Sequence, residues 1–191
     1  MLFRSAESLR TQRFAFLFAP KFHPAFKHIA PARKLCAERG QRTIFNFLGP
    51  LLNPARPTAQ LIGVPRPELC EPMAKVLQSL GVRRGMVVCG EVQRQTAKGE
   101  RTEPSAHLDE LSTLGETTIA EFYHDRGFAV SKLSPKDFPL QPATLKDLAG
   151  GDRAANAEIV RQLLAGNRHG PKRDAVLLNA GAALFIAGRT K

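Results

Sequence analysis

Two adjacent carboxylates in this sequence could do chemistry. Asp109 and Glu110 follow Leu108 and precede Leu111-Ser112. Carboxylate oxygens are hard ligands, and Mg²⁺ typically binds one or two of them together with phosphate oxygens. An Asp-Glu pair is also common on solvated surfaces, so the pair alone leaves both interpretations open.

A second candidate group lies within residues 16–64, where His23, Arg33 and a Gly49-Pro50 turn occur between apolar runs. Proline cannot donate a backbone hydrogen bond and fixes its own φ, so Gly-Pro ends a regular element abruptly. Such ends are places where loops that carry function sit on a rigid scaffold. By themselves, Arg33 could be a surface cation and His23 could cap its own helix.

The elements that must position these residues begin with a strand, helix and strand within about thirty residues. Leu61–Val64 has the length of a buried strand, and Met86–Cys89 has the same character. Between them, Glu68–Leu80 places apolar residues at a spacing of three or four and ends at Gly81, which predicts a helix. This pattern predicts a βαβ unit in a parallel sheet.

The stretch before this unit is predicted to hold one more strand and a short helix. Phe14–Phe18 is apolar and ends at Ala19-Pro20, which predicts a buried strand. His23-Pro24 opens a helical stretch that we expect to break at Pro31.

After the unit, residues 91–106 are polar without periodicity and are predicted to form an exposed loop. Thr117–Phe122 and Phe128–Leu133 are predicted to pair around a short turn. Asn156–Leu164 is predicted to be a helix, and Asp174 is a candidate cap for a last helix.

Composition narrows the class of protein. A chain of 191 residues with 43% hydrophobic residues suits a single domain over 1–191, and no run approaches the length of a membrane span. The net charge of +11 favours anionic partners, either a phosphorylated small molecule or a nucleic acid. Three cysteines without metal spacing suggest reduced thiols and a cytoplasmic location.

Several segments together carry a resemblance to the anthranilate phosphoribosyltransferase family. They are FLFAP, HPAFK, PARK, RTIFNFLGPLLNPA and QLIGV, followed by Leu108–Ser112, Gly151–Asn156 and Leu177–Ala180. The resemblance implies the nucleoside phosphorylase/phosphoribosyltransferase type of α/β fold. That fold has a central, mostly parallel sheet flanked by helices, which we expect to be incomplete here.

The resemblance also implies an activity and a set of site residues. Family members transfer the phosphoribosyl group of phosphoribosyl pyrophosphate to anthranilate and release pyrophosphate, which makes them pentosyltransferases of tryptophan biosynthesis. Arg33 matches the family's anthranilate-binding arginine, with His23 and Pro50 beside the ring, and Asp109 and Glu110 match its Mg²⁺ ligands. No catalytic residue is assigned.

The sequence departs from the family pattern at its phosphate-binding part. The glycine-rich, Asn-Ser-Thr and Lys-His-Gly-Asn segments that precede FLFAP in the family are not found in the sequence, and the segments 35–41 and 91–106 are longer than usual. We therefore expect the C-terminal portion of the α/β domain, without the helical domain and the first strand. Stability would then need a complementing N-terminal polypeptide or an oligomer, and the full-length family implies a homodimer.

Two alternatives remain open at this point. One is a non-catalytic relative that binds nucleic acid through its basic surface, which the net charge of +11 favours. The other is a phosphoribosyltransferase or nucleoside phosphorylase with a different acceptor, because the longer 35–41 segment would lie close to the acceptor pocket.

Overall fold

The structure of the chain is a computed structural model. It divides into two compact units, Met1–Arg56 and Pro57–Lys191. The prediction of one partial domain over 1–191 stays a prediction. The described residues are 2–41, 43–93, 106–125 and 127–190.

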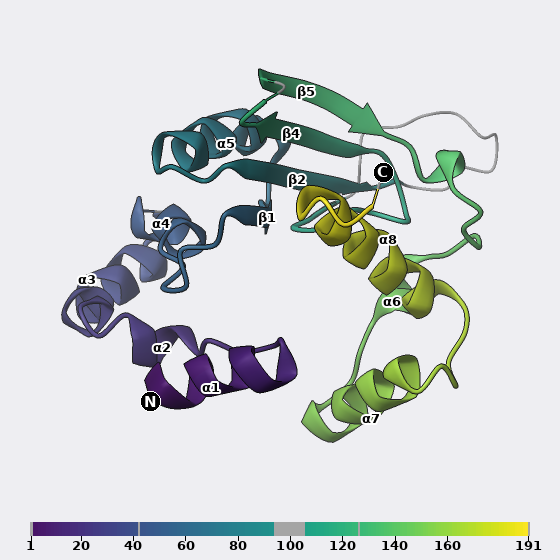
Figure 1. The fold of residues 1–191 in the computed structure, drawn as a ribbon, viewed down its shortest axis with the longest axis horizontal. Helices are drawn as coiled ribbons and strands as arrows, with labels where there is room; N and C mark the ends of the chain where they lie inside the picture. The colour runs from purple at the N-terminus through teal and green to yellow at the C-terminus, as the bar shows by residue number, and fades with distance from the viewer. Residues whose placement is uncertain (1, 42, 94–105, 126, 191) are drawn as a thin grey trace. The chain divides into compact units, whose positions relative to one another are not determined.

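The described part of the first unit is helical (Figure 1). Its helices are α1 (Leu2–Gln12), α2 (Ala19–Phe22), α3 (Phe26–Glu38) and α4 (Phe45–Leu51). The helix α3 continues through Pro31, so the predicted break there is wrong. Because the residues around Pro31 are exposed, water can hydrate the carbonyl that loses its intrahelical partner.

The segment Phe14–Phe18 is not the buried strand that its apolar run predicts. It has no regular secondary structure, and the side chains of Phe14, Phe16 and Phe18 are exposed. A strand needs a partner for its backbone groups, and the sequence of one segment cannot show whether a partner is present.

The second unit contains the predicted βαβ arrangement. The strands β1 (Ala59–Gly63) and β2 (Arg84–Val92) pair in parallel, with Leu61 opposite Met86. A 3₁₀ turn at Pro67–Leu69 leads into α5 (Cys70–Ser79), which forms the crossover. The predicted helix and both predicted strands are therefore confirmed.

The sheet is mixed, so the prediction of a mostly parallel sheet is wrong, although the α/β class is confirmed. The main strand order is β1-β2-β4-β5. The strand β4 (Thr117–Tyr123) is antiparallel to both β2 and β5 (Gly127–Leu133), and β3 (Ala106–Leu108) is antiparallel to β2. Among the described strands, only β1 and β2 are joined by a helical crossover long enough for parallel pairing.

The predicted exposed loop at residues 91–106 is shorter at both ends. Glu91 and Val92 still belong to β2, and Ala106 already belongs to β3, because these residues pair across the two strands. Residues 94–105 lie outside the described part of the chain.

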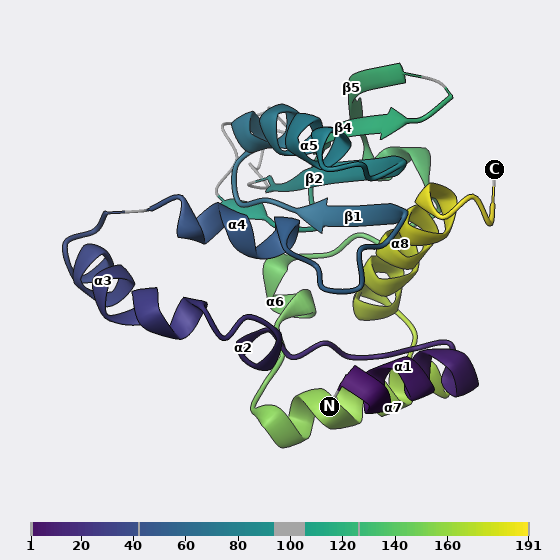
Figure 2. The same ribbon diagram turned by 60° about the vertical axis from the view of Figure 1, so that its left-hand side comes forward.

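Helices lie on both faces of the sheet (Figures 1 and 2). On one face, α5 buries Cys70, Met73, Ala74 and Leu77. On the other face, α8 (Pro171–Ile186) packs through Ile186 against a cluster that contains Met86, Val88, Leu111, Ile119 and Tyr123. The central strands β2 and β4 are therefore covered on both faces and hold the core of this unit, whereas β5 is mostly exposed.

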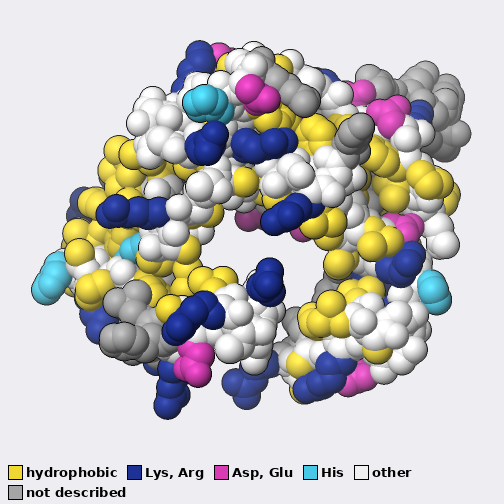
Figure 3. Space-filling view, viewed as in Figure 1, with side chains coloured by type: hydrophobic (Ala, Val, Ile, Leu, Met, Phe, Trp, Pro, Cys, Tyr) yellow, Lys and Arg dark blue, Asp and Glu magenta, His cyan; other side chains and the backbone are white. Residues whose placement is uncertain are grey.

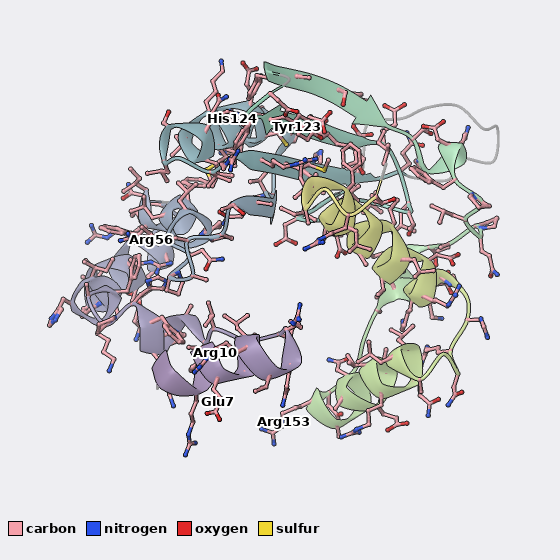
Figure 4. All side chains as sticks on the ribbon, in the orientation of Figure 1. Glu7, Arg10, Arg56, Tyr123, His124 and Arg153 are labelled. Carbon is pink, nitrogen blue, oxygen red and sulfur yellow. The ribbon has the colours of Figure 1, made fainter. Side chains whose placement is uncertain are left out.

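The last helix is tied to the sheet at its C-terminal end. The ring of Tyr123, which Figure 4 labels beside β4, meets the ring of Phe185 edge to face with centroids 6.2 Å apart. Arg84 lies over the Tyr123 ring and donates from Nη2 to the carbonyl of Phe185 at 3.3 Å. A cation near a helix C-terminus is favourable, because the last carbonyl groups carry a partial negative charge.

Two further helices precede α8 in the chain. They are α6 (Leu145–Leu148) and α7 (Arg153–Leu164), after a 3₁₀ turn at Pro135–Asp137. Asp174 does not cap α8, because the helix begins after Gly170, and its carboxylate instead accepts from the backbone N–H of Gln141. Among the described helices, none combines the length and apolar character of a membrane span.

Candidate acceptor and metal sites

A pocket of about 400 Å³ lies within the first unit, between α2, α3 and α4. It brings His23 and Arg33 together, two of the three residues predicted to bind the acceptor. The described lining residues are Ala19, Pro20, His23, Phe26, Lys27, Ala30, Arg33, Phe45 and Gly49.

The helix α3 provides one continuous wall of this pocket. Phe26, Ala30 and Arg33 follow each other at spacings of four and three residues, so they share one face of the helix. If α3 had ended at Pro31, Arg33 would have left this face. The error in the helix prediction therefore concerns the element that positions the arginine.

Edge-to-face aromatic contacts join Phe26 of α3 to residues on the other sides of the pocket. The ring of His23 meets that of Phe26 at 5.6 Å, and Phe26 meets Phe45 of α4 at 6.1 Å, with interplanar angles of 88° and 86°. These edge-to-face pairs are a favourable aromatic geometry. They connect α3 to α4 across the pocket.

The third predicted acceptor residue, Pro50, does not itself line the pocket. It lies inside α4, next to Gly49, which does. Arg42, which opens the RTIFN segment, lies outside the described residues. Sequence reasoning missed Lys27 and Phe45, although Lys27 precedes Arg33 by six residues on the same helix.

The lining has the chemistry of a site for a flat anion. Arg33 is half-buried, Lys27 is exposed, and none of the described lining residues is acidic. Phe26, Phe45 and His23 add aromatic surface. An aromatic carboxylate would place its ring among the side-chain rings and its charge at the cations.

The two predicted metal ligands lie in the second unit, directly after β3. Asp109 and Glu110 are both exposed. Partial loss of hydration raises the pKa of Glu110, and the negative charge of Asp109 raises it further. A bound cation would relieve the repulsion between the two carboxylates.

Close backbone contacts hold this carboxylate loop against the carboxyl ends of β1 and β2. Gly63 is the last residue of β1, and a Cβ there would overlap the backbone carbonyl of Asp109. Gly90 lies near the end of β2, and a Cβ there would come within 2.6 Å of the carbonyl oxygen of Glu110. The absence of side chains at these two positions permits the close approach.

A clamp from α8 fixes the residue that follows the two carboxylates. The Asn179 carboxamide accepts from the backbone N–H of Leu111 at 2.9 Å and donates to its carbonyl at 3.0 Å. Ser112 donates from Oγ to the carbonyl of Glu91 at 2.7 Å, and its N–H bonds the Thr117 hydroxyl. The carboxamide of Asn179 thus satisfies both backbone groups of Leu111.

The donor set of the loop fits magnesium better than a metal that takes several nitrogen or sulfur ligands. In the described part of the chain, no three His, Cys, Asp or Glu side chains gather as a metal cage. Mg²⁺ does not need such a cage, because it keeps waters and substrate phosphate oxygens beside one or two carboxylates. Two exposed neighbouring carboxylates on an anchored loop meet that requirement.

Residues 4–191 match the family described as "Glycosyl transferase family, a/b domain". The chain belongs to this family. An anthranilate phosphoribosyltransferase of Lacticaseibacillus casei is 46% identical over 183 residues, which are 96% of this chain and 48% of that protein. The anthranilate phosphoribosyltransferase 2 of Streptomyces coelicolor is 46% identical over 173 residues, which are 91% of this chain and 46% of that protein.

The family fold is also seen in a solved structure. The crystal structure of anthranilate phosphoribosyltransferase from Thermus thermophilus superimposes with a TM-score of 0.79 and 42% sequence identity, covering 98% of this chain and 50% of that chain. The chain therefore spans about half the length of the curated and solved relatives it matches.

Proposed function

We propose that this chain provides the acceptor-binding and metal-binding part of an anthranilate phosphoribosyltransferase. The reaction transfers the phosphoribosyl group of phosphoribosyl pyrophosphate to the amine of anthranilate and releases pyrophosphate. Relatives with that name at 46% identity support the reaction class. The observation that carries the assignment is the pocket in which Arg33 and His23 meet beside Phe26.

In this proposal the pocket orients anthranilate by its carboxylate. Arg33 forms two parallel hydrogen bonds with the carboxylate, which fixes the plane of the ring. Phe26 and Phe45 supply apolar contacts, and His23 lies beside the ring as a hydrogen-bond donor or as a wall. Gly49 lines the pocket, and the neighbouring Pro50 restricts the backbone of α4 at this point.

Asp109 and Glu110 would hold Mg²⁺ in the complete enzyme. The ion would neutralise the negative charge that develops on the leaving pyrophosphate. The contribution of this chain is to keep the two carboxylates exposed and fixed, through Gly63, Gly90 and Asn179. Loss of any of these supports should weaken metal binding without removing a ligand.

The remaining parts of the site would come from outside these 191 residues. We propose that a complementing polypeptide, N-terminal in the family order, supplies the cradle for the phosphates of phosphoribosyl pyrophosphate, and that the complete enzyme is a homodimer in the cytoplasm. Free Cys36, Cys70 and Cys89 fit a reducing compartment.

The test is the loss of anthranilate fluorescence after addition of phosphoribosyl pyrophosphate and Mg²⁺. It is run on the chain alone and with the missing family half supplied in trans. We expect turnover only when the chain and the missing half are both present. In that mixture, Arg33→Ala should lower kcat/KM for anthranilate by at least about 30-fold. Arg39→Ala is the matched control, since Arg39 is exposed at the end of α3 and does not line the pocket. Equal losses in the two variants would contradict the assignment.

A second candidate function is nucleic-acid binding, which one observation favours. Residues 1–56 contain ten of the 28 Lys and Arg residues but only two of the 17 acidic residues. On the face drawn in Figure 3, hydrophobic side chains lie among Lys and Arg side chains over α3 and α4. Binding of single-stranded DNA that weakens steeply with salt, without any turnover of anthranilate, would favour this candidate.

A further inference from the structure

Two glutamates of like charge lie side by side at the end of β2 that carries the carboxylate loop. Glu91 is near the end of β2, and Glu116 directly precedes β4. Gly90 lies opposite Thr117 in the antiparallel ladder, so the next pair along it is Glu91 and Glu116, and the N–H of Glu91 donates to the carbonyl of Glu116 at 2.7 Å. Their side chains are only 15% and 16% exposed. Like charges opposite each other on neighbouring strands repel, and weak solvation strengthens the repulsion.

Lys132 of the strand β5 offsets this repulsion. Its Nζ lies 3.2 Å from Oε2 of Glu116 and 3.7 Å from Oε1 of Glu91. Figure 1 shows the strand order that brings the three residues together, with β4 between β5 and β2. Because both carboxylates are largely buried, the ammonium group between them matters more than an ion pair on the open surface does.

The two glutamates also hold the loop that carries the candidate metal ligands. The carbonyl of Glu91 accepts from Ser112 Oγ at 2.7 Å. A Cβ at Gly115 would come within 2.6 Å of the same carbonyl oxygen, so the loop lies closely against it. Glu116 is the last residue of the loop before β4. A separation of Glu91 from Glu116 would therefore displace the loop close to Glu110.

We propose that Lys132 is a positioning residue for the metal site at Asp109 and Glu110. An ammonium group donates hydrogen bonds and has no lone pair for a metal ion, so Lys132 acts only through its neighbours. By neutralising Glu91 and Glu116, it keeps the end of β2 beside the start of β4, and the loop between them holds its two exposed carboxylates in place. The inference rests on the proposed function for the identity of the site.

Positioning and direct electrostatics predict opposite effects of this lysine on the metal. A cation near the site repels a second cation, so the loss of Lys132 would tighten metal binding if its charge acted directly on the ion. If Lys132 acts through the loop, its loss leaves Glu91 and Glu116 to repel each other and weakens metal binding. The sign of the change therefore separates the two explanations.

The experiment measures the binding of Mn²⁺, as a probe for Mg²⁺, to the 191-residue chain by water-proton relaxation. We expect Lys132→Met to raise the dissociation constant about tenfold, as for other residues that orient metal ligands. Lys132→Arg keeps the charge and should retain most of the affinity. The matched control is Lys136→Met, which removes the same charge from an exposed residue and should change the dissociation constant by less than about twofold.

A second substitution tests the repulsion itself. In the Lys132→Met chain, Glu116→Gln removes one of the two like charges and restores the net charge of the original chain. The dissociation constant should then return to within about threefold of the original value. A direct effect of charge on the ion predicts the reverse step, because Glu116→Gln removes a negative charge and would weaken the binding of a cation.

Hydrogen exchange without metal reports on the loop directly. The N–H groups of Leu111 and Ser112 are bonded to side chains of α8 and β4, so both amides should be protected while the loop is in place. Lys132→Met should speed their exchange by at least about tenfold and change that of Val87, in the middle of β2, by less than about twofold.

Three results would overturn the proposal. They are tighter or unchanged Mn²⁺ binding by the Lys132→Met chain, an equal loss in the Lys136→Met chain, and unchanged exchange at Leu111 and Ser112. Asp109→Asn separates this proposal from the proposed function. Binding of Mn²⁺ that depends on Asp109 but not on Lys132 would contradict the role of the lysine alone, whereas the lack of any binding that depends on Asp109 would contradict the metal site and, with it, both proposals.

Discussion

The two units stabilise their candidate sites in different ways. In the described part of the chain, every buried hydrophobic residue lies at Ile62 or later, so the first unit has no buried core of its own. Its pocket depends on helix geometry and on the edge-to-face contact of two aromatic rings between α3 and α4. The carboxylate loop of the second unit instead lies against a covered sheet and is fixed by backbone contacts.

A binding site and a folding core can therefore occupy separate parts of one chain. Apolar burial is the main favourable contribution to folding, and the sheet unit holds it. The helical unit leaves large apolar side chains exposed, including Phe16 and Ile44.

Truncation of a phenylalanine should be costly in the second unit and nearly neutral in the first. Phe122 is 1% exposed in β4, so Phe122→Ala should lower the free energy of unfolding by about 3–5 kcal/mol. Phe16→Ala should change it by less than about 0.5 kcal/mol. Urea denaturation of both variants measures the contrast, and similar losses would show that the first unit has a core of its own.

The three thiols should separate by unit in a reaction with a thiol reagent. Burial raises the pKa of Cys70 to about 12 and that of Cys89 to about 11, whereas Cys36 on α3 is only half-buried. At pH 8, a thiol with a pKa near 11 forms on the order of a hundredfold less thiolate than an ordinary cysteine. One fast and two slow thiols are therefore expected in the native chain.

In denaturant, all three thiols should react fast with the reagent. In the native chain, Cys36→Ser should remove the fast phase of the reaction. Fast reaction of Cys70 or Cys89 in the native chain would contradict the burial of the sheet face under α5.

Alanine at a glycine should destabilise the second unit but not the first. Gly63→Ala would force the backbone of Asp109 away from β1, so the free energy of unfolding should fall by about 1–3 kcal/mol. At Gly49, inside α4, a Cβ would meet no atom within 4 Å, and alanine should stabilise that helix by about 0.5–1 kcal/mol. Thermal unfolding of the two variants would show shifts of opposite sign.

Alkaline pH should lower the free energy of unfolding of the second unit because of its two buried thiols. Their pKa values are raised in the folded state, so the unfolded chain loses its protons first and stability falls as pH rises above about 9. The loss should be about 1 kcal/mol for each thiol between about pH 9 and pH 10. The double variant Cys70→Ala and Cys89→Ala should flatten this pH dependence, and an unchanged slope would assign the loss to other groups.

Local patterns predicted the helices and strands that depend mainly on their own residues. The βαβ unit was predicted because the apolar spacing of Glu68–Leu80 and the strand-like runs on both sides are local signals. Strand direction was predicted correctly where a short turn joins two strands, as between β4 and β5, but not between segments farther apart. The antiparallel pairing of β4 with β2 joins segments about thirty residues apart, and a resemblance at the level of the family did not fix it.

The candidate site was also predicted in part. Arg33, His23, Asp109 and Glu110 came from motifs, and the structure places the first two in one pocket and the others on one anchored loop. The wall residue Phe45 was missed, because its contact with Phe26 exists only after α3 and α4 pack together.

The family, the charge and the helices α5 and α7 follow from the sequence alone, because residue types and short-range spacing carry that information. Only the tertiary structure shows that α3 continues past Pro31, that Gly63 and Gly90 admit the carboxylate loop, and that Phe14–Phe18 pairs with none of the described strands. The physical reason is that close approach, solvent access to a carbonyl and strand pairing each depend on atoms far away in the sequence.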